Sequence, residues 1–162
     1  MSLCKNFIAF TLLTIFAFNI NAAGIEKGDK TISIFGSLTS DDFSDTLTIF
    51  ATGGIFYTDV IELQGSVVLI DSGNFSQTGL GGNVNLYLPG KNPDLVPYVG
   101  GGMQLILSDT GFGSDTSLGL NAQAGLKQFI SEEIAINYQA QLLNSSDYDA
   151  FILSAGITLF FE

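Results

Sequence analysis

The 162-residue chain contains no histidine, no tryptophan and no arginine, and its single cysteine is Cys4. Without histidine there can be no Ser–His or Cys–His nucleophile pair and no imidazole ligand for a metal ion. The usual zinc sites need Cys or His, so they are excluded as well. We therefore predict that the protein is not an enzyme and has neither a cofactor nor a metal site.

Positive charge is also scarce. Five lysines stand against sixteen Asp and Glu residues, which gives a formal net charge of −11. A nucleic-acid binder needs clustered Lys and Arg to neutralise phosphates, and the lysines of this chain form no cluster. We expect no nucleic-acid partner.

Only the N-terminus carries a long apolar run. Lys5 precedes an apolar segment at residues 7–20, and small residues follow at 21–23. This order is typical of a secretory signal peptide, and the run is too short for a stop-transfer helix. We predict that residues 1–23 are removed, the only cysteine with them, and that 24–162 form one mature domain. The alternative is an N-terminal membrane anchor.

The mature chain shows apolar residues alternating with polar or small ones almost throughout. Eight segments have this period of two: 30–40, 46–57, 60–70, 79–88, 96–107, 117–128, 133–143 and 151–161. Such alternation predicts β-strands with one apolar face, and about ten residues suffice to cross a bilayer when the strand is tilted. In the last segment the apolar face consists of Phe151, Leu153, Ala155, Ile157, Leu159 and Phe161.

The connections between these segments also alternate. Those after the second, fourth and sixth segments are short, whereas the others are mostly longer and rich in Asp, Ser and Gly. This favours a barrel with both chain termini on the short-turn side. The acidic and aromatic residues that we predict as loop contacts for an extracellular partner are Asp41, Asp42, Phe43, Asp45, Phe75, Phe112 and Tyr148. The three aspartates could instead hold a divalent cation, but their spacing matches no EF-hand, so solvated loops are preferred.

The polar face of the strands decides which side faces the protein interior. A soluble sandwich or lipocalin-like barrel turns its apolar face inward, and a membrane barrel turns it outward. A water-facing sheet would carry interspersed Lys and Glu, but here the polar face holds amides, hydroxyls, glycines and aromatics. We therefore predict an all-β fold: an eight-stranded antiparallel up-and-down transmembrane β-barrel with short periplasmic turns and longer extracellular loops.

Glu62 and Lys127 are the only charges inside the strands on that polar face. Both fall near the periplasmic ends of their segments. We predict a structural ion pair or two solvated charges at the rim, rather than a gate or a catalytic pair. No second carboxylate shares the face for acid–base chemistry.

Two stretches carry a family resemblance. VPYVGGGM at 96–103 resembles the strand opening common in the small outer-membrane barrels of the OmpA/OmpX kind, and LNAQAGLKQFI at 120–130 is similar to their late hairpin. The resemblance covers the whole mature chain. It implies a Gram-negative outer-membrane location and insertion by the barrel-assembly machinery, which recognises a C-terminal strand ending in an aromatic. This chain departs slightly, because Phe161 is penultimate and Glu162 is last.

These observations lead to one preferred function and two alternatives. An eight-stranded barrel is just wide enough for side chains to fill, so we expect an outer-membrane protein with a structural, adhesion or other surface-interaction role through its acidic loops. The first alternative is a narrow channel or small-ligand conduit, which lumen aromatics such as Phe50, Tyr98 and Phe160 oppose. The second is a soluble secreted or periplasmic lipocalin-like ligand-binding barrel.

Overall fold

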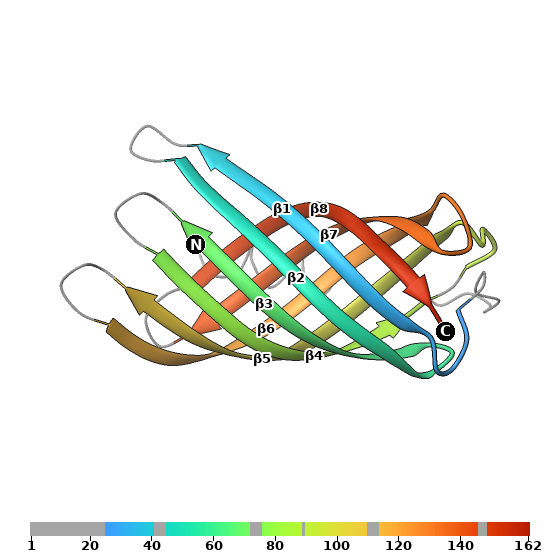
Figure 1. Ribbon diagram of the computed structural model, residues 1–162, viewed down its shortest axis with the longest axis horizontal. Helices are drawn as coiled ribbons and strands as arrows, with labels where there is room; N and C mark the ends of the chain where they lie inside the picture. Colours follow the sequence, from blue (N-terminus) through green and yellow to red (C-terminus); the bar gives the residue numbers. More distant parts are fainter. Residues whose placement is uncertain (1–24, 41–44, 72–75, 89, 110–113, 146–148) are drawn as a thin grey trace, which may run out of the picture.

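The computed structural model describes residues 25–40, 45–71, 76–88, 90–109, 114–145 and 149–162. Eight strands, each antiparallel to its neighbours, close into one barrel in chain order (Figure 1). They are β1 (Lys30–Ser40), β2 (Asp45–Thr58), β3 (Ile61–Asp71), β4 (Ser76–Tyr87), β5 (Leu95–Asp109), β6 (Ser114–Phe129), β7 (Ile134–Ser145) and β8 (Asp149–Phe161). Within the described ranges, no helix is long and apolar enough to span a membrane. The predicted eight-stranded up-and-down barrel is confirmed.

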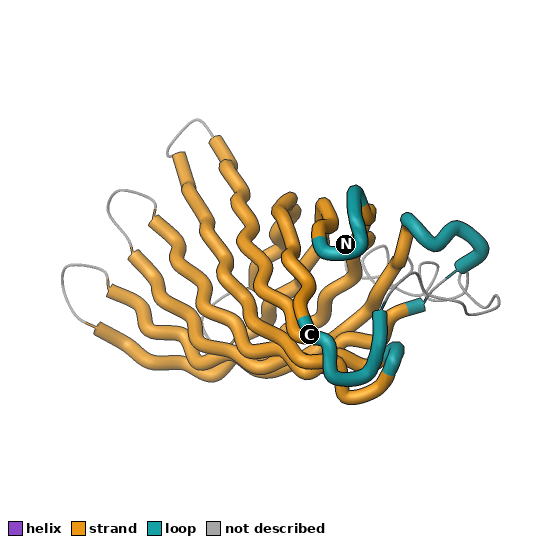
Figure 2. The backbone as a smooth tube through the Cα atoms, turned by 45° about the vertical axis from the view of Figure 1, so that its right-hand side comes forward, coloured by secondary structure: helices purple, strands orange, loops and turns teal. Residues whose placement is uncertain are grey.

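The strand registers fix the tilt of the strands. One row of paired residues runs from Thr31 on β1 around the wall to Ala150 on β8. The partner of Thr31 across the closing seam is Phe160, ten residues further along β8. A shift of ten residues around eight strands corresponds to a tilt of roughly 40°. Figure 2 shows the strands crossing the barrel obliquely.

The connections differ less in length than the sequence predicts. Three or four residues separate the strands at one end, and two, seven and four separate them at the other. The loop-end connections are shorter than predicted because Asp and Ser residues next to them still pair between strands, as Ser76 does with Asp109 and Asp109 with Ser114. Polar side chains permit this where the strands extend beyond an apolar belt. The end of the barrel with connections β2–β3, β4–β5 and β6–β7 is called the turn end below, and the opposite end the loop end.

Several predicted features lie outside the described residues. These are the signal peptide and the loop contacts Asp41, Asp42, Phe43, Phe75, Phe112 and Tyr148. Asp45 is described as the first residue of β2 rather than as part of a loop.

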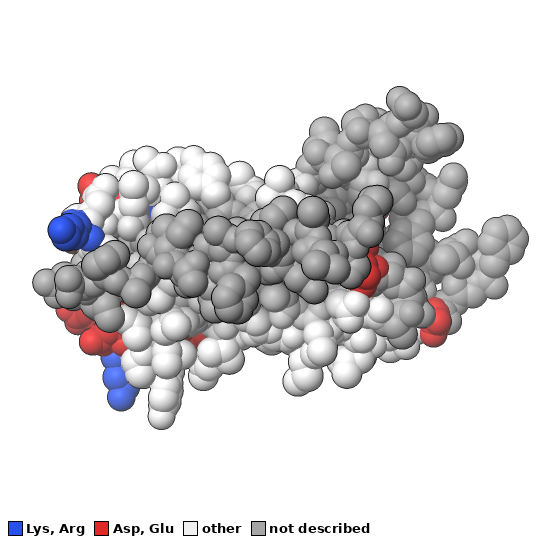
Figure 3. Space-filling model, turned by 180° about the vertical axis from the view of Figure 1, so that it is seen from behind, with Lys and Arg blue, Asp and Glu red and all other residues white. Residues whose placement is uncertain are grey.

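The apolar residues of the strands face outward, as predicted. The exposed side chains include Ile34 (61%), Leu118 (61%) and Leu153 (63%). All six residues of the apolar face of β8 are exposed. On the side of the molecule seen in Figure 3, charged side chains are concentrated toward the two ends of the barrel. The outer wall is therefore an apolar belt, and the polar residues lie inside.

Candidate functional site: the filled lumen

An apolar plug closes the turn end of the lumen. It consists of Ile25, Phe56, Tyr87, Val96, Tyr98, Ala135 and Phe160, with Phe129 packed against them. The Phe129 and Phe160 ring centroids lie 4.9 Å apart, and those of Phe56 and Phe160 lie 6.3 Å apart. The Gly28 backbone N–H donates to the Phe56 carbonyl at 2.9 Å and so holds the segment before β1 against β2.

Glu62 on β3 pairs with Phe56 of the plug and is completely buried. Its carboxylate accepts hydrogen bonds from the Thr31 hydroxyl, from Asn85 Nδ2 at 3.0 Å and from the Tyr87 hydroxyl at 2.7 Å. Three donors satisfy much of what a buried carboxylate loses when it leaves water. The lumen face of Gly54 makes this approach possible, since a Cβ there would collide with Glu62 and Thr31.

Lys127 is also buried, inside a cage of aromatic rings. Its Nζ lies 5.1 Å from the ring centroid of Phe160, 5.4 Å from that of Tyr87 and 5.9 Å from that of Tyr98. It also lies 3.5 Å from the hydroxyl of Thr158, to which it donates. Cation–π attraction of this kind strengthens when the cation is removed from water.

Tyr87 links the two charges, which form no direct ion pair among the described residues. Its hydroxyl binds Glu62 while its ring faces the ammonium group of Lys127. The interpretation of Glu62 and Lys127 as solvated rim charges is wrong, because both side chains are buried in the lumen. The plug below them excludes the solvent that a rim position would offer.

The alternation of 96–107 predicts that Tyr98 faces the lumen, but it does not predict the part of Tyr98 in this network. Its hydroxyl donates to the amide oxygens of Asn137, at 3.1 Å, and Gln139, at 2.9 Å, and its ring stacks on Tyr87 with centroids 5.3 Å apart. A side chain at Gly125 would collide with the Tyr98 ring. The available signal was the alternation of the polar face, which puts these residues in the lumen without showing which of them meet.

Glu62 and Lys127 are called the charged layer below. From this layer toward the loop end, the buried side chains are first uncharged and polar, and then apolar. Gln123 Nε2 donates to Asn85 Oδ1 at 2.6 Å, and the hydroxyls of Ser33 and Thr158 lie 2.8 Å apart. Toward the loop end, a second buried cluster consists of Phe35, Phe50 and Val68, with Ile70 and Ile152 packed against it. This second cluster comes from β1, β2, β3 and β8 only, and Ile152 pairs with Gln141, so apolar and amide side chains share this part of the lumen.

Comparisons with known proteins bear on the fold. No protein-family model matches the chain, and no match was found among curated proteins. Among solved structures, the N-terminal β-barrel domain of Pseudomonas aeruginosa OprF is 20% identical with a TM-score of 0.68, and the match covers 83% of this chain and 98% of that one. Neisserial surface protein A is 13% identical with a TM-score of 0.66, covering 88% and 100%. The outer membrane protein OprG from P. aeruginosa is 12% identical with a TM-score of 0.64, covering 88% and 100%.

The fold is that of the small outer-membrane barrels. The match spans nearly the full length of each of these three structures, so the chain contains one complete barrel of this kind. At these identities the likeness concerns the fold alone, and the side chains must supply any argument about function.

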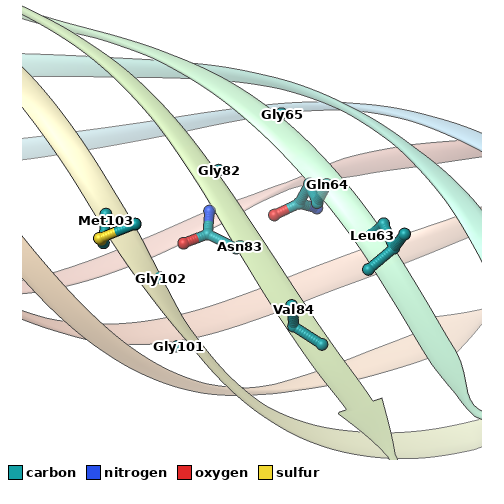
Figure 4. A pocket seen from close by; sticks show the side chains of 9 residues that line it. All are labelled: Leu63, Gln64, Gly65, Gly82, Asn83, Val84, Gly101, Gly102 and Met103. Atoms are coloured by element: carbon teal, nitrogen blue, oxygen red, sulfur yellow. The ribbon is translucent and has the colours of Figure 1, made fainter.

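Two hollows mark the surface of this outer-membrane barrel fold. One, of about 1040 Å³, lies at the turn end and is lined by Phe129, Phe160 and six acidic residues: Glu26, Asp29, Asp94, Glu132, Glu133 and Glu162. The other, of about 410 Å³, is a groove on the wall between β3, β4 and β5, where Leu63, Val84 and Met103 flank a stretch of glycines (Figure 4). Among the described residues, no cluster of His, Cys, Asp and Glu is arranged to hold a metal ion.

Proposed function

We propose that the protein is a non-enzymatic, non-conducting integral protein of the outer membrane that serves envelope structure or surface interaction through the connections at its loop end. The observation that carries this proposal is the sidedness of the wall, with apolar side chains outside and buried charged and amide side chains inside. In water such a belt would be an aggregation surface. In a bilayer the apolar belt contacts lipid chains, and the closed barrel satisfies the backbone hydrogen bonds.

Export and assembly complete the proposal. The signal peptide at 1–23 would direct the chain across the inner membrane, and β8, with Phe161 on its outward face, would be read by the barrel-assembly machinery. The test is the position and heat modifiability of the protein. Recovery in the outer-membrane fraction, with a gel mobility that shifts on boiling, is the expected result. A soluble protein with one mobility would favour the lipocalin-like alternative.

The layered lumen supports a barrel that does not conduct. The plug lies across the lumen at the turn end, and the cluster around Phe35 and Phe50 fills one side of the lumen nearer the loop end. The folded mature protein should therefore leave a planar lipid bilayer at background conductance. Steps of reproducible size would support the narrow-conduit alternative, particularly if Phe50→Ala and Phe160→Ala increased them.

The loops are the proposed contact surface. Neisserial surface protein A, which shares the fold, is by its name a surface protein. A strain lacking the protein would be complemented with the wild type or with a variant in which Phe43, Phe75, Phe112 and Tyr148 are all serine. If the variant restores detergent resistance but not attachment of the cells to surfaces, the loops act in contact. If it restores both, the barrel has a structural role and the loop contacts are wrong.

A further inference from the structure

The segment before β1 is held at the turn end although it belongs to no strand. Ile25, its first described residue, is 5% exposed and is part of the plug. The backbone N–H groups that follow have partners as well. That of Glu26 donates to Asp29 Oδ2 at 2.8 Å, and that of Lys27 donates to Asp59 Oδ1 at 3.1 Å. The chain is therefore anchored from Ile25 onward.

The acidic hollow at the turn end adjoins this anchor. Glu26 and Asp29 of the anchored segment line it together with Phe160 of the plug. The remaining acidic residues of the lining are Asp94, Glu132, Glu133 and Glu162. Lys27 does not belong to the lining, and its Nζ lies 5.9 Å from the ring centroid of the exposed Tyr57. The part of the lining that the structure describes is thus acidic and apolar, without a basic side chain.

Removal of residues 1–23 creates a positive charge next to this hollow. The new α-ammonium group belongs to Gly24, and the chain geometry keeps its nitrogen within about 5 Å of the Ile25 Cα. On the lumen side of the plug, Tyr87 and Phe160 already lie around the ammonium group of Lys127. A second ammonium group there would be desolvated and repelled. The hollow is the side on which carboxylates are available.

We propose that the mature N-terminus docks in the acidic hollow, with Ile25 as its apolar anchor and the surrounding carboxylates as partners of the α-ammonium group. The anchor keeps the effective concentration of this group at the hollow high, and the nearby negative charges favour its charged form. In the precursor the same nitrogen is an uncharged amide, so docking follows cleavage. The proposal rests on removal of the signal peptide, which is part of the proposed function.

The test is the pKa of the α-amino group in the exported protein, extracted in detergent. The N-terminal residue is identified from the intact mass, and acetylation by acetic anhydride is followed against pH by mass spectrometry. A free α-amino group has a pKa of about 7.7–8.0. The docked group should have a pKa about one unit higher, so that it reacts about tenfold more slowly at pH 7 than in the same protein unfolded in urea.

The possible failures are distinguishable. A retained leader would overturn both this proposal and the predicted export. A processed chain whose folded and unfolded forms have the same α-amino pKa would overturn this proposal alone, and would leave the hollow to a cationic segment of another protein.

A first pair of variants tests the carboxylates. Glu132→Gln with Glu162→Gln removes two charges from the hollow and should lower the α-amino pKa of the folded protein. Asp115→Asn with Asp149→Asn is the matched control, because it removes the same charge at the loop end and should leave that pKa unchanged. Equal effects of the two double variants would mean that net charge, and not docking in the hollow, sets the pKa.

A second pair tests the anchor. Ile25→Ser should release the terminus and return the α-amino pKa to its unfolded value, although every carboxylate of the hollow remains. Ile32→Ser, on the exposed face of β1, is the control and should retain the raised pKa. A raised pKa in both variants would contradict the role of Ile25.

Discussion

The two halves of the barrel are closed in different ways. In the turn half, β1 and β8 pair from Lys30 with Phe161 to Gly36 with Ala155. In the loop half they do not pair, although β1 continues to Ser40 and β8 begins at Asp149. In Figure 1 the loop end of β1 lies apart from β8, whereas β2 stays paired with β3 as far as Leu47 with Asp71.

The lumen side chains follow the same division. In the turn half, Thr31 bonds to Glu62 on β3, and Ser33 bonds to Thr158 across the seam itself. Where the seam ends, the lumen contacts of β1 and β8 are apolar, through Phe35 and Ile152. Directional polar bonds fix one register, whereas apolar contacts tolerate several. We infer that the buried network, in addition to the backbone ladder, holds the barrel shut from its turn end.

The largest expected effect comes from breaking the charged layer. Glu62→Gln leaves Lys127 buried without a counter-charge and should lower the free energy of unfolding by about 3–5 kcal/mol. Urea unfolding in lipid vesicles measures this. Adding Lys127→Met should recover part of the loss. The exposed Glu133→Gln is the control and should change stability by less than about 0.5 kcal/mol. If the Glu62→Gln variant is as stable as the wild type, the network does not hold the turn half together.

A smaller effect is expected from filling the space beside Tyr98. Gly125→Ala places a Cβ against the Tyr98 ring and should cost about 1–3 kcal/mol. Gly36→Ala, on β1, is the control because nothing lies within 4 Å of its Cβ position. The two variants unfolding at the same urea concentration would contradict the tight packing inferred for the turn half.

Tyr87→Phe removes one hydrogen-bond donor from Glu62 and keeps the ring over Lys127. It should lower stability by roughly 1–3 kcal/mol, less than Glu62→Gln does. The outward-facing Tyr57→Phe is the matched control and should be nearly neutral. If both tyrosine variants behave alike in the same unfolding assay, the hydroxyl of Tyr87 does not bridge the charges.

Cysteine pairs across the seam between β1 and β8 should have the smallest effect on stability. They test directly whether the two strands lie side by side. Ser33→Cys with Thr158→Cys occupies a paired position and should form a disulfide readily. Ser37→Cys with Ser154→Cys occupies the next lumen position in register after Gly36 with Ala155, where pairing has ended, and should cross-link much more slowly. Mobility on a non-reducing gel distinguishes them. Equal rates would mean that the seam closes along its whole length.

Much of the fold could be predicted because alternation is a local property. The period of two in 30–40 and 151–161 already indicates strands, and the lack of charge on the polar face indicates that this face is the lumen. The lengths of the connections could not be predicted as well, since Asp and Ser residues join a strand when the neighbouring strand offers a ladder. Glu62 and Lys127 were found as lumen charges, but their aromatic and amide partners were not.

The sequence by itself determined the number of strands, which face meets lipid and which residues enter the lumen, because each follows from side chains two positions apart on one strand. Only the tertiary structure decided which lumen residues meet. The ten-residue shift around the closed barrel brings Glu62 of β3, Tyr87 of β4 and Lys127 of β6 together. That shift is a property of the closed ring of strands, and no single strand carries it.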